Sequence, residues 1–370
     1  MRINKNIKLI LFFYLFILIV DKCHNNSLKK IQKAKLLSNN DIKKIKNSKR
    51  KLQGICDDFY ENEDYFTPLN IYIDELCLEE ELKGEINRYK NIIKNAMDNA
   101  AKVLKKILKV CPSGASPFYS DSQVSDNLGV TVWNNTLIGS GVENMVGGMF
   151  TKVVHYRVWT KVAPQNTMGE KIASSRIVLN EGMCGVPIIG IVTLNPDIDY
   201  SKFPSSYLDL IMIHQFTHLL GFHKTFKNPK IPSEDDEGGD EEEDIEFISP
   251  IKEDTSNPGH YYVDSENVIN FAEKYFDCNS ITKIDIEMDG DSPHWPSRIL
   301  LGEYMTGLKY PEEQVISGFT LSYFEDLKYL RVENKFTGGL MRFGKNKGCD
   351  FLEKQCIGEN GGNLKFEHEF

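Results

Sequence analysis

Two histidines four residues apart, His214 and His218, lie in the apolar stretch IMIHQFTHLLGF at residues 211–222. On an α-helix, residues i and i+4 lie on one face, so the two imidazoles can reach a single ion. Catalytic zinc takes three protein ligands and keeps one open position. The spacing alone is weak evidence, but burying two imidazoles in an apolar helix costs free energy unless they are hydrogen-bonded or ligated. Gly221 lets the backbone turn away after the helix, as a third ligand from elsewhere requires.

The residue after the first histidine is Gln215, where the zinc-peptidase signature H-E-x-x-H has a glutamate. That glutamate acts as the general base toward the metal-activated water. The Gln215 amide can hold a water but cannot accept a proton, and loss of a positioned base costs ~10²–10⁴-fold in rate. His223 and Glu303 are the nearest titratable groups by sequence that could stand in for the missing carboxylate.

Three interpretations remain open. The chain is an active or weakly active zinc endopeptidase, a pseudopeptidase that binds zinc and peptide or adheres to a surface, or a structural protein whose histidines bind nothing. Zinc binding should survive the glutamine in the first two, because the metal ligands are unchanged.

The elements that would position these groups follow from hydrophobic periodicity and end signals. The histidine helix is predicted over 205–222, with Ser206 as N-cap, Asp209 three residues later and Gly221 at its end. An amphipathic helix is predicted over 79–110, and loops with short strands over 112–150. The other predicted elements are strands at 68–75, 153–164 and 190–196 and helices at 265–276 and 317–330.

Charge and cysteine content restrict the partners and the compartment. The net charge of −9 arises from residues 233–246, which hold ten acidic side chains; without them the balance is −9 + 10 = +1. A nucleic-acid partner is not expected, since no basic surface is indicated. Arg2, Lys5 and Lys8 precede twelve apolar residues, 9–20, a pattern typical of a signal peptide. The alternative is an uncleaved anchor associated with a membrane. Secretion makes disulfides plausible among the eight cysteines, including a local Cys349–Cys356 loop.

The segments HQFTHLLGF and HWPSRILLGEYMTG together resemble the leishmanolysin (gp63-type) zinc metallopeptidases, a branch of the metzincins. The usual metzincin motif would place a third histidine at position 224, which is Lys224 here. Leishmanolysin relatives instead carry an insertion and take the third ligand from an H-W segment. The resemblance implies one Zn²⁺ held by His214, His218 and His294, with Met305 in a Met-turn beneath it. Cys23 resembles a propeptide cysteine that could act as a latency thiol; the alternatives are a disulfide partner or a residue that merely follows the signal peptide.

The resemblance also implies an α+β fold of the metzincin type: a twisted mixed sheet, long helices and a metal site in a cleft between two subdomains. We expect a signal peptide at 1–22, a pro-segment or flexible lead at 23–66, an N-terminal zincin subdomain at 67–226, an acidic disordered insertion at 227–260 and a C-terminal subdomain at 261–370. The expected partner is an extended peptide or protein substrate, and the chain is expected to be a monomer.

Overall fold

The computed structural model describes residues 66–73, 82–111, 155–180, 186–227, 249–307, 314–333 and 341–353, with single positions and short strands between these ranges. The predicted signal peptide, most of the pro-segment and the acidic run 233–246 lie outside the described residues, apart from the short strand β12 that touches its end. Among the described residues, no helix combines the length and apolar content needed to cross a bilayer.

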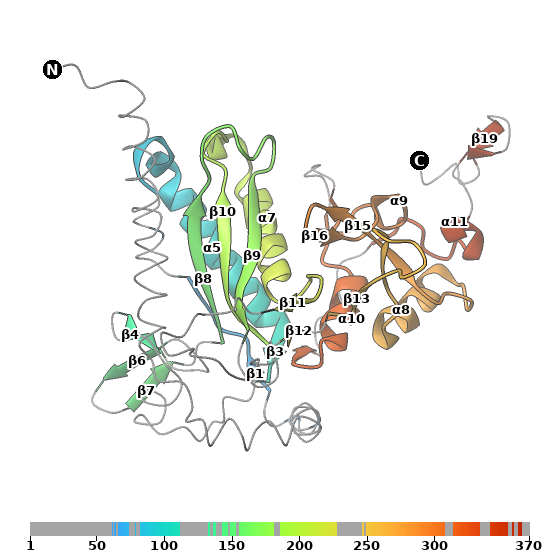
Figure 1. Cartoon of the computed structure of the whole chain (residues 1–370), viewed down its shortest axis with the longest axis horizontal. Coiled ribbons are helices and arrows are strands. Elements are labelled where there is room, and N and C mark those ends of the chain that lie inside the picture. Colours follow the sequence, from blue (N-terminus) through green and yellow to red (C-terminus); the bar gives the residue numbers. More distant parts are fainter. Residues whose placement is uncertain are drawn as a thin grey trace, which may run out of the picture.

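The N-terminal half is built on a four-stranded mixed sheet in the order β2-β8-β10-β9 (Figure 1). Strands β2 (Ile71–Ile73), β8 (Tyr156–Val162) and β10 (Pro187–Leu194) are parallel. The edge strand β9 (Ala173–Asn180) pairs antiparallel with β10. The sequence of β10, PIIGIVTL, is a nearly continuous apolar run, as a central strand requires.

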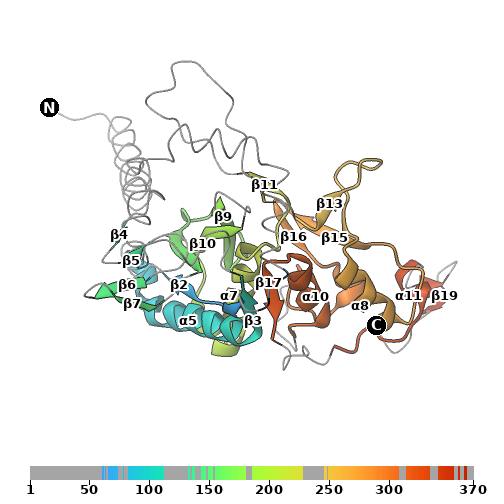
Figure 2. The ribbon, with the colours of Figure 1, turned by 90° about the horizontal axis from the view of Figure 1, so that it is seen from below.

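Two helices pack side by side against one face of this sheet (Figures 1 and 2). Helix α5 (Lys90–Ile107) buries one apolar stripe and is preceded by a 3-10 turn, η2 (Gly84–Tyr89). Helix α7 (Ser205–Leu219) is apolar nearly all round because it lies between α5, the sheet and the C-terminal half. Gly190 of β10 allows its close approach, because a Cβ at that position would lie 2.5 Å from the Leu219 Cδ2 atom.

The C-terminal half carries an antiparallel sheet of β13 (Ile251–Glu253), β14 (Tyr261–Val263), β15 (Ile284–Asp289) and β16 (Ser292–His294). Helices α8 (Glu266–Phe276) and α10 (Gly318–Asp326) pack against each other and lie next to this sheet in Figures 1 and 2. The shorter elements are η3 (Tyr200–Lys202), α9 (Ser297–Leu300), α11 (Cys349–Glu353), β4 (Val132–Trp133), β5 (Thr136–Leu137), β6 (Glu143–Val146), β7 (Met149–Lys152), β11 (Phe226–Lys227), β12 (Glu246–Phe247), β18 (Ile357–Gly358) and β19 (Gly362–Leu364).

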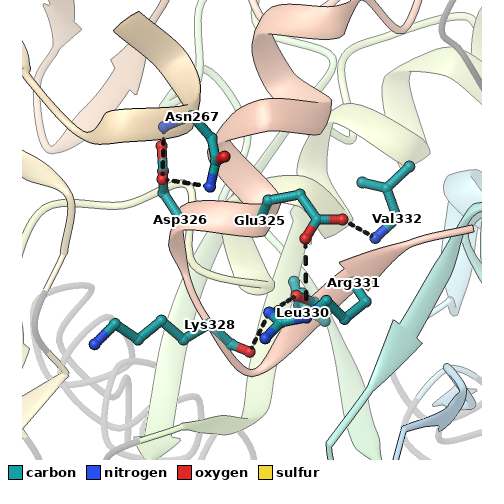
Figure 3. Close-up of polar contacts among 7 residues, drawn as sticks. All are labelled: Asn267, Glu325, Asp326, Lys328, Leu330, Arg331 and Val332. Atoms are coloured by element: carbon teal, nitrogen blue, oxygen red, sulfur yellow. Dashed lines mark hydrogen bonds and ion pairs between the residues drawn. The ribbon is translucent and has the colours of Figure 1, made fainter. Parts of the chain in front are cut away.

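Helix α10 ends in two carboxylates, Glu325 and Asp326, which accept hydrogen bonds from neighbouring segments (Figure 3). Asp326 accepts the backbone N–H groups of Asn267 and Val268 at 3.0 and 3.1 Å, so it caps the first turn of α8 from a remote segment. Glu325 accepts the Val332 N–H at 2.5 Å and thereby holds the strand that follows α10.

The two halves are joined by a three-stranded sheet that contains strands from both of them. Strand β3 (Leu108–Val110) pairs with both β1 (Thr67–Pro68) and β17 (Leu330–Val332). Residues 330–332, which the predicted division assigns to the C-terminal subdomain, thus pair with a strand of the N-terminal half. Residues 249–260, at the end of the predicted acidic insertion, are described and contain β13.

Several predicted boundaries are wrong. The helix predicted over 79–110 ends at Ile107, and the one predicted over 317–330 ends at Asp326. The N-cap of α7 is Pro204, not Ser206, and Asp209 instead accepts a hydrogen bond from the Asn99 amide of α5 at 3.2 Å.

Candidate metal centre

The three histidines singled out in the sequence converge on one point. The Nε2 atoms of His214 and His218, one turn apart on α7, lie 3.1 Å from each other. His294 ends strand β16, and its Nε2 lies 3.3 Å from that of His214. The three candidate ligand atoms all lie within 4.8 Å of one another. Residues separated by 80 positions are therefore brought together by the contact between α7 and the β15–β16 hairpin.

Two of the rings are oriented by backbone carbonyl groups. The Nδ1 atom of His214 lies 2.7 Å from the Tyr304 carbonyl oxygen, and that of His218 lies 2.8 Å from the Phe222 carbonyl oxygen. A carbonyl can only accept, so each Nδ1 carries the proton and each Nε2 presents its lone pair. Hydrogen bonds of this kind fix the tautomer and orientation of histidine ligands to metals.

The donor set fits zinc. Lone pairs that face one another at 3.1 and 3.3 Å repel unless a cation lies between them. Zinc–nitrogen bonds of ~2.1 Å in a tetrahedral site would separate the nitrogens by ~3.4 Å, close to these spacings. Burial lowers the pKa of His214 to about 4 and of His294 to about 3, and the pKa of His218 lies well below its ordinary value for the same reason. The imidazoles are therefore neutral at physiological pH, as metal ligation requires.

The end of α7 is shaped to supply one of these carbonyls. Gly221 has φ of +111°, a backbone conformation that L side chains rarely adopt. Its carbonyl accepts the Tyr323 hydroxyl at 2.9 Å, and the Leu220 carbonyl accepts the Tyr329 hydroxyl at 2.8 Å. The chain turns there so that the Phe222 carbonyl faces back to His218. Gly221 thus has the sharp-turn role that the sequence predicts.

The segment after His294 returns to the histidines as a tight turn. Met305 is fully buried, and its carbonyl accepts the Trp295 N–H at 2.9 Å. Tyr304, which faces His214 through its carbonyl, also places its hydroxyl 2.7 Å from the Thr217 hydroxyl of α7. A Cβ on Gly307 would lie 3.8 Å from the His294 ring, in ordinary contact. The turn therefore links α7 to the strand that carries the third histidine.

Two ion pairs fix the hairpin of His294 to the N-terminal half. Lys171, just before β9, lies 2.8 Å from Asp289, and Lys224, after α7, lies 2.5 Å from Asp291. Both pairs are largely solvent-exposed, so each contributes at most ~1 kcal/mol.

The other candidate residues take separate places. Gln215 is 7% exposed and lies on α7 next to the paired histidines. The His223 Nδ1 atom faces the Lys224 carbonyl at 2.8 Å, and His223 is not part of the three-histidine cluster. Glu303 is fully buried in hydrogen bonds to the turn around Met305 and is likewise not part of that cluster. Cys23 lies outside the described residues.

Some functional contacts carried no signal in the sequence. The carbonyl groups of Tyr304 and Phe222 belong to the backbone, so residue type does not reveal them. The Thr217 hydroxyl donates to the Ile213 carbonyl at 2.9 Å while bonding Tyr304, which explains a polar residue on the buried helix. The predicted local Cys349–Cys356 loop is wrong, because Cys349 forms a disulfide with Cys278 and so connects α11 to the end of α8.

The metal-free protein is expected to lose stability as the pH falls below ~6.5, where imidazoles of the unfolded chain take up protons. The folded pKa values of His214 and His294, about 4 and about 3, lie below that, so the unfolded state binds more protons in between. In that pH window, each such histidine lowers the free energy of unfolding by about 1.4 kcal/mol for every unit by which the pH falls. Burial raises the pKa of Glu303 to about 7. The folded state therefore takes up this proton before the unfolded chain does, so Glu303 raises the free energy of unfolding as the pH falls.

The buried imidazoles outnumber this single carboxyl, so the free energy of unfolding should fall as the pH is lowered. Urea unfolding in a chelating buffer at pH 7, 6 and 5 measures it. A stability that is constant or rises across that range would contradict the buried, neutral histidines.

The chain is similar in sequence to one family model and to several curated proteins. The family model described as Leishmanolysin (Peptidase_M8) matches residues 177–364, just over half of the chain. The Leishmanolysin homolog of Crithidia fasciculata is 26% identical over 180 residues, which are 47% of this chain and 24% of that protein. Leishmanolysin of Leishmania chagasi is 23% identical over 180 residues, 48% of this chain and 27% of that protein.

A third relative, the Leishmanolysin-like peptidase of Caenorhabditis elegans, is 30% identical over 89 residues, 23% of this chain and 13% of that protein. The aligned part of the chain thus spans about a quarter or less of the length of these curated relatives. The matched family region contains α7 with its histidine pair, His294 and the turn at Met305. The chain therefore belongs to the leishmanolysin family of metallopeptidases.

Proposed function

We propose that the chain is a secreted leishmanolysin-like zinc metalloendopeptidase whose turnover is impaired because Gln215 replaces the general base. The observation that carries this proposal is the convergence of the His214, His218 and His294 Nε2 atoms within 4.8 Å, with two Nδ1 atoms bound to carbonyls. Three neutral imidazoles at this spacing are suited to one zinc ion. Zinc, when bound, would supply a Lewis acid and an acidified water for hydrolysis of a peptide bond.

The chain's own groups would hold the substrate and handle the proton. Strand β9 is the edge of the four-stranded sheet and packs against α7, so an extended peptide could add to it by main-chain hydrogen bonds. We place the substrate cleft between this edge and the β15–β16 hairpin. The Gln215 amide could orient a water molecule through its carbonyl oxygen or its NH₂ group. It cannot accept the proton of that water, so the transfer lacks a positioned acceptor.

A second candidate, favoured by the same glutamine, is an inactive pseudopeptidase. Such a protein would keep zinc and the peptide-binding edge and act by binding peptides or adhering to a surface. Nothing about the three histidines distinguishes this alternative from a slow peptidase, since the ligands are the same in both. The rate of cleavage decides between them.

The secretory route also belongs to the proposal. The Cys278–Cys349 disulfide supports it, because such bonds form and persist in oxidising compartments. The basic and apolar residues at positions 2–20 have the pattern of a signal peptide, or of an uncleaved segment that would keep the protein at a membrane surface.

Metal analysis together with a peptide assay tests the proposal. The purified full chain, dialysed against trace zinc, should retain one zinc ion per molecule and cleave a quenched fluorescent peptide library slowly. Zinc-dependent peptide binding without any cleavage would favour the pseudopeptidase. A chain that retains no zinc at neutral pH would contradict both candidates.

A further inference from the structure

Glu303 is a fully buried carboxylate close to the metal centre that has no place in the proposed ligand set. A buried carboxylate is costly unless its oxygens are satisfied by hydrogen bonds. One oxygen accepts the Met305 N–H. The other accepts the Thr320 hydroxyl at 2.6 Å and the Ser317 hydroxyl and N–H at 3.1 and 3.4 Å. The carboxylate thus joins the turn at Met305 to the first turn of α10.

The turn that Glu303 holds is the one that orients His214. The Thr306 N–H and hydroxyl both bond the Glu303 carbonyl, at 3.2 and 2.8 Å, so the carboxylate and the backbone of Glu303 close the turn from two sides. The Tyr304 carbonyl lies inside this closed turn, 2.7 Å from the His214 Nδ1 atom. A change in the turn would therefore move the acceptor that fixes the tautomer of His214.

The same carboxylate is connected to the segment that carries His294. The Thr320 hydroxyl donates to Glu303 and accepts the Trp295 indole N–H at 2.9 Å. The Trp295 backbone N–H donates to the Met305 carbonyl at 2.9 Å. Trp295 follows His294 directly, and it is fully buried. These two contacts of Trp295 thus lead to Thr320 and Met305, residues that Glu303 also binds.

We propose that Glu303 is a positioning residue: by fixing the turn 303–306 and its links to Trp295, it holds His214 and His294 in the arrangement that binds zinc. This inference rests on the proposed zinc site and adds to it a residue that contacts neither metal nor substrate. Groups that orient histidine ligands from outside the coordination sphere typically change metal affinity by ~10–100-fold when they are removed.

The substitution Glu303→Gln tests this role with little change in shape. A glutamine in either amide orientation turns its NH₂ group toward a backbone N–H, that of Met305 or that of Ser317, so one contact becomes donor against donor. Zinc affinity, measured by competition with a chromophoric chelator, should fall ~10–100-fold. The visible absorption spectrum of the cobalt-loaded protein should shift in band position or intensity, because the ligand geometry is altered.

Glu325→Gln is the matched control. Glu325 is a partly buried carboxylate at the end of α10 that accepts the Val332 N–H and lies 3.9 Å from the Arg331 guanidinium (Figure 3). In the part of the chain that the structure describes, these contacts lead to β17 and not to the histidines. Both variants should lower the unfolding temperature of the metal-free protein, but only Glu303→Gln should weaken zinc binding and change the cobalt spectrum. Zinc affinity that falls equally in both would show a general loss of stability and overturn the inference.

A third variant covers the case in which Glu303→Gln does not fold. Thr320→Val keeps the side-chain shape and removes the hydroxyl between Glu303 and the Trp295 indole. It should also weaken zinc binding and change the cobalt spectrum. Unchanged affinity and spectrum in the folded variants would overturn the positioning role while leaving the zinc site intact. A starting protein that binds no zinc would instead contradict the proposed function itself.

Discussion

Replacing Gln215 with glutamate is expected to raise peptide-bond hydrolysis by ~10²–10⁴-fold, which corresponds to lowering the barrier by ~3–5 kcal/mol. Gln215 lies beside His214 on α7 and is 7% exposed, so a glutamate would occupy a largely buried position of the same length. Unlike the amide, its carboxylate can accept a proton from water and return it to the leaving amine. The measurement is kcat/KM for a quenched fluorescent peptide with zinc-saturated protein.

The zinc content of both proteins should be equal, because the substitution leaves the three imidazoles untouched. Gln215→Ala is the matched control: it should not raise the rate, since it supplies no base. The pH–rate profile of Gln215→Glu should also acquire an acid limb that belongs to the new carboxyl. Equal rates for the glutamine and glutamate forms at equal zinc content would contradict the role assigned to Gln215.

Removing His294 is expected to abolish stoichiometric zinc binding. Two imidazoles from α7 remain in His294→Ala, but a catalytic zinc site uses three protein ligands. The loss of affinity should exceed the ~10–100-fold effect that removal of an outer hydrogen-bond partner has. Competition with a chromophoric chelator at neutral pH measures it, and the cobalt spectrum reports whether a weak, altered site persists.

His223→Ala provides the comparison, since His223 is the histidine nearest to the position of the third ligand in the usual metzincin motif. Its Nδ1 atom faces the Lys224 carbonyl, and it is not part of the three-histidine cluster. Zinc affinity should therefore remain within a few-fold of the starting protein. Loss of zinc in His223→Ala with retention in His294→Ala would refute the assignment of the third ligand.

The helices that position the site could be predicted from local periodicity, but their exact limits could not. Apolar spacing identifies α5, whereas α7 is apolar nearly all round and is identified by its start and stop signals; the limits of α8 are predicted to within one residue. The ends differ where a long-range pairing competes with the helix. Residues 108–110 continue the pattern of α5 but pair with β17, and residue 330 leaves α10 for the same sheet. Such pairings depend on segments more than 200 residues apart, which local patterns do not reveal.

The edge strand β9 was not predicted, although its sequence, ASSRIVLN, ends in an apolar run. The signal was ambiguous because its first half is polar, as is common in a strand at the edge of a sheet. The disulfide shows a related limit. Sequence proximity favoured Cys349 with Cys356, whereas folding places Cys349 beside Cys278, 71 positions away.

At the metal centre, the sequence reveals the candidate ligand residues but not the groups that orient them. The i, i+4 histidine pair follows from helix geometry, whereas His294 came only from the family resemblance, because 80 residues separate it from His214. Glu303 was identified in the sequence as a titratable neighbour. The structure gives it hydrogen bonds to Met305, Ser317 and Thr320, a role that depends on how α10 packs under the turn.

The three-histidine site requires one zinc ion bound between α7 and the hairpin of His294. Crystals of the zinc-loaded protein, measured on both sides of the zinc absorption edge, locate that ion without reference to activity. A single anomalous peak at bonding distance from the Nε2 atoms of His214, His218 and His294 is the predicted result. A peak that lacks His294, or no peak among these three rings, would contradict it.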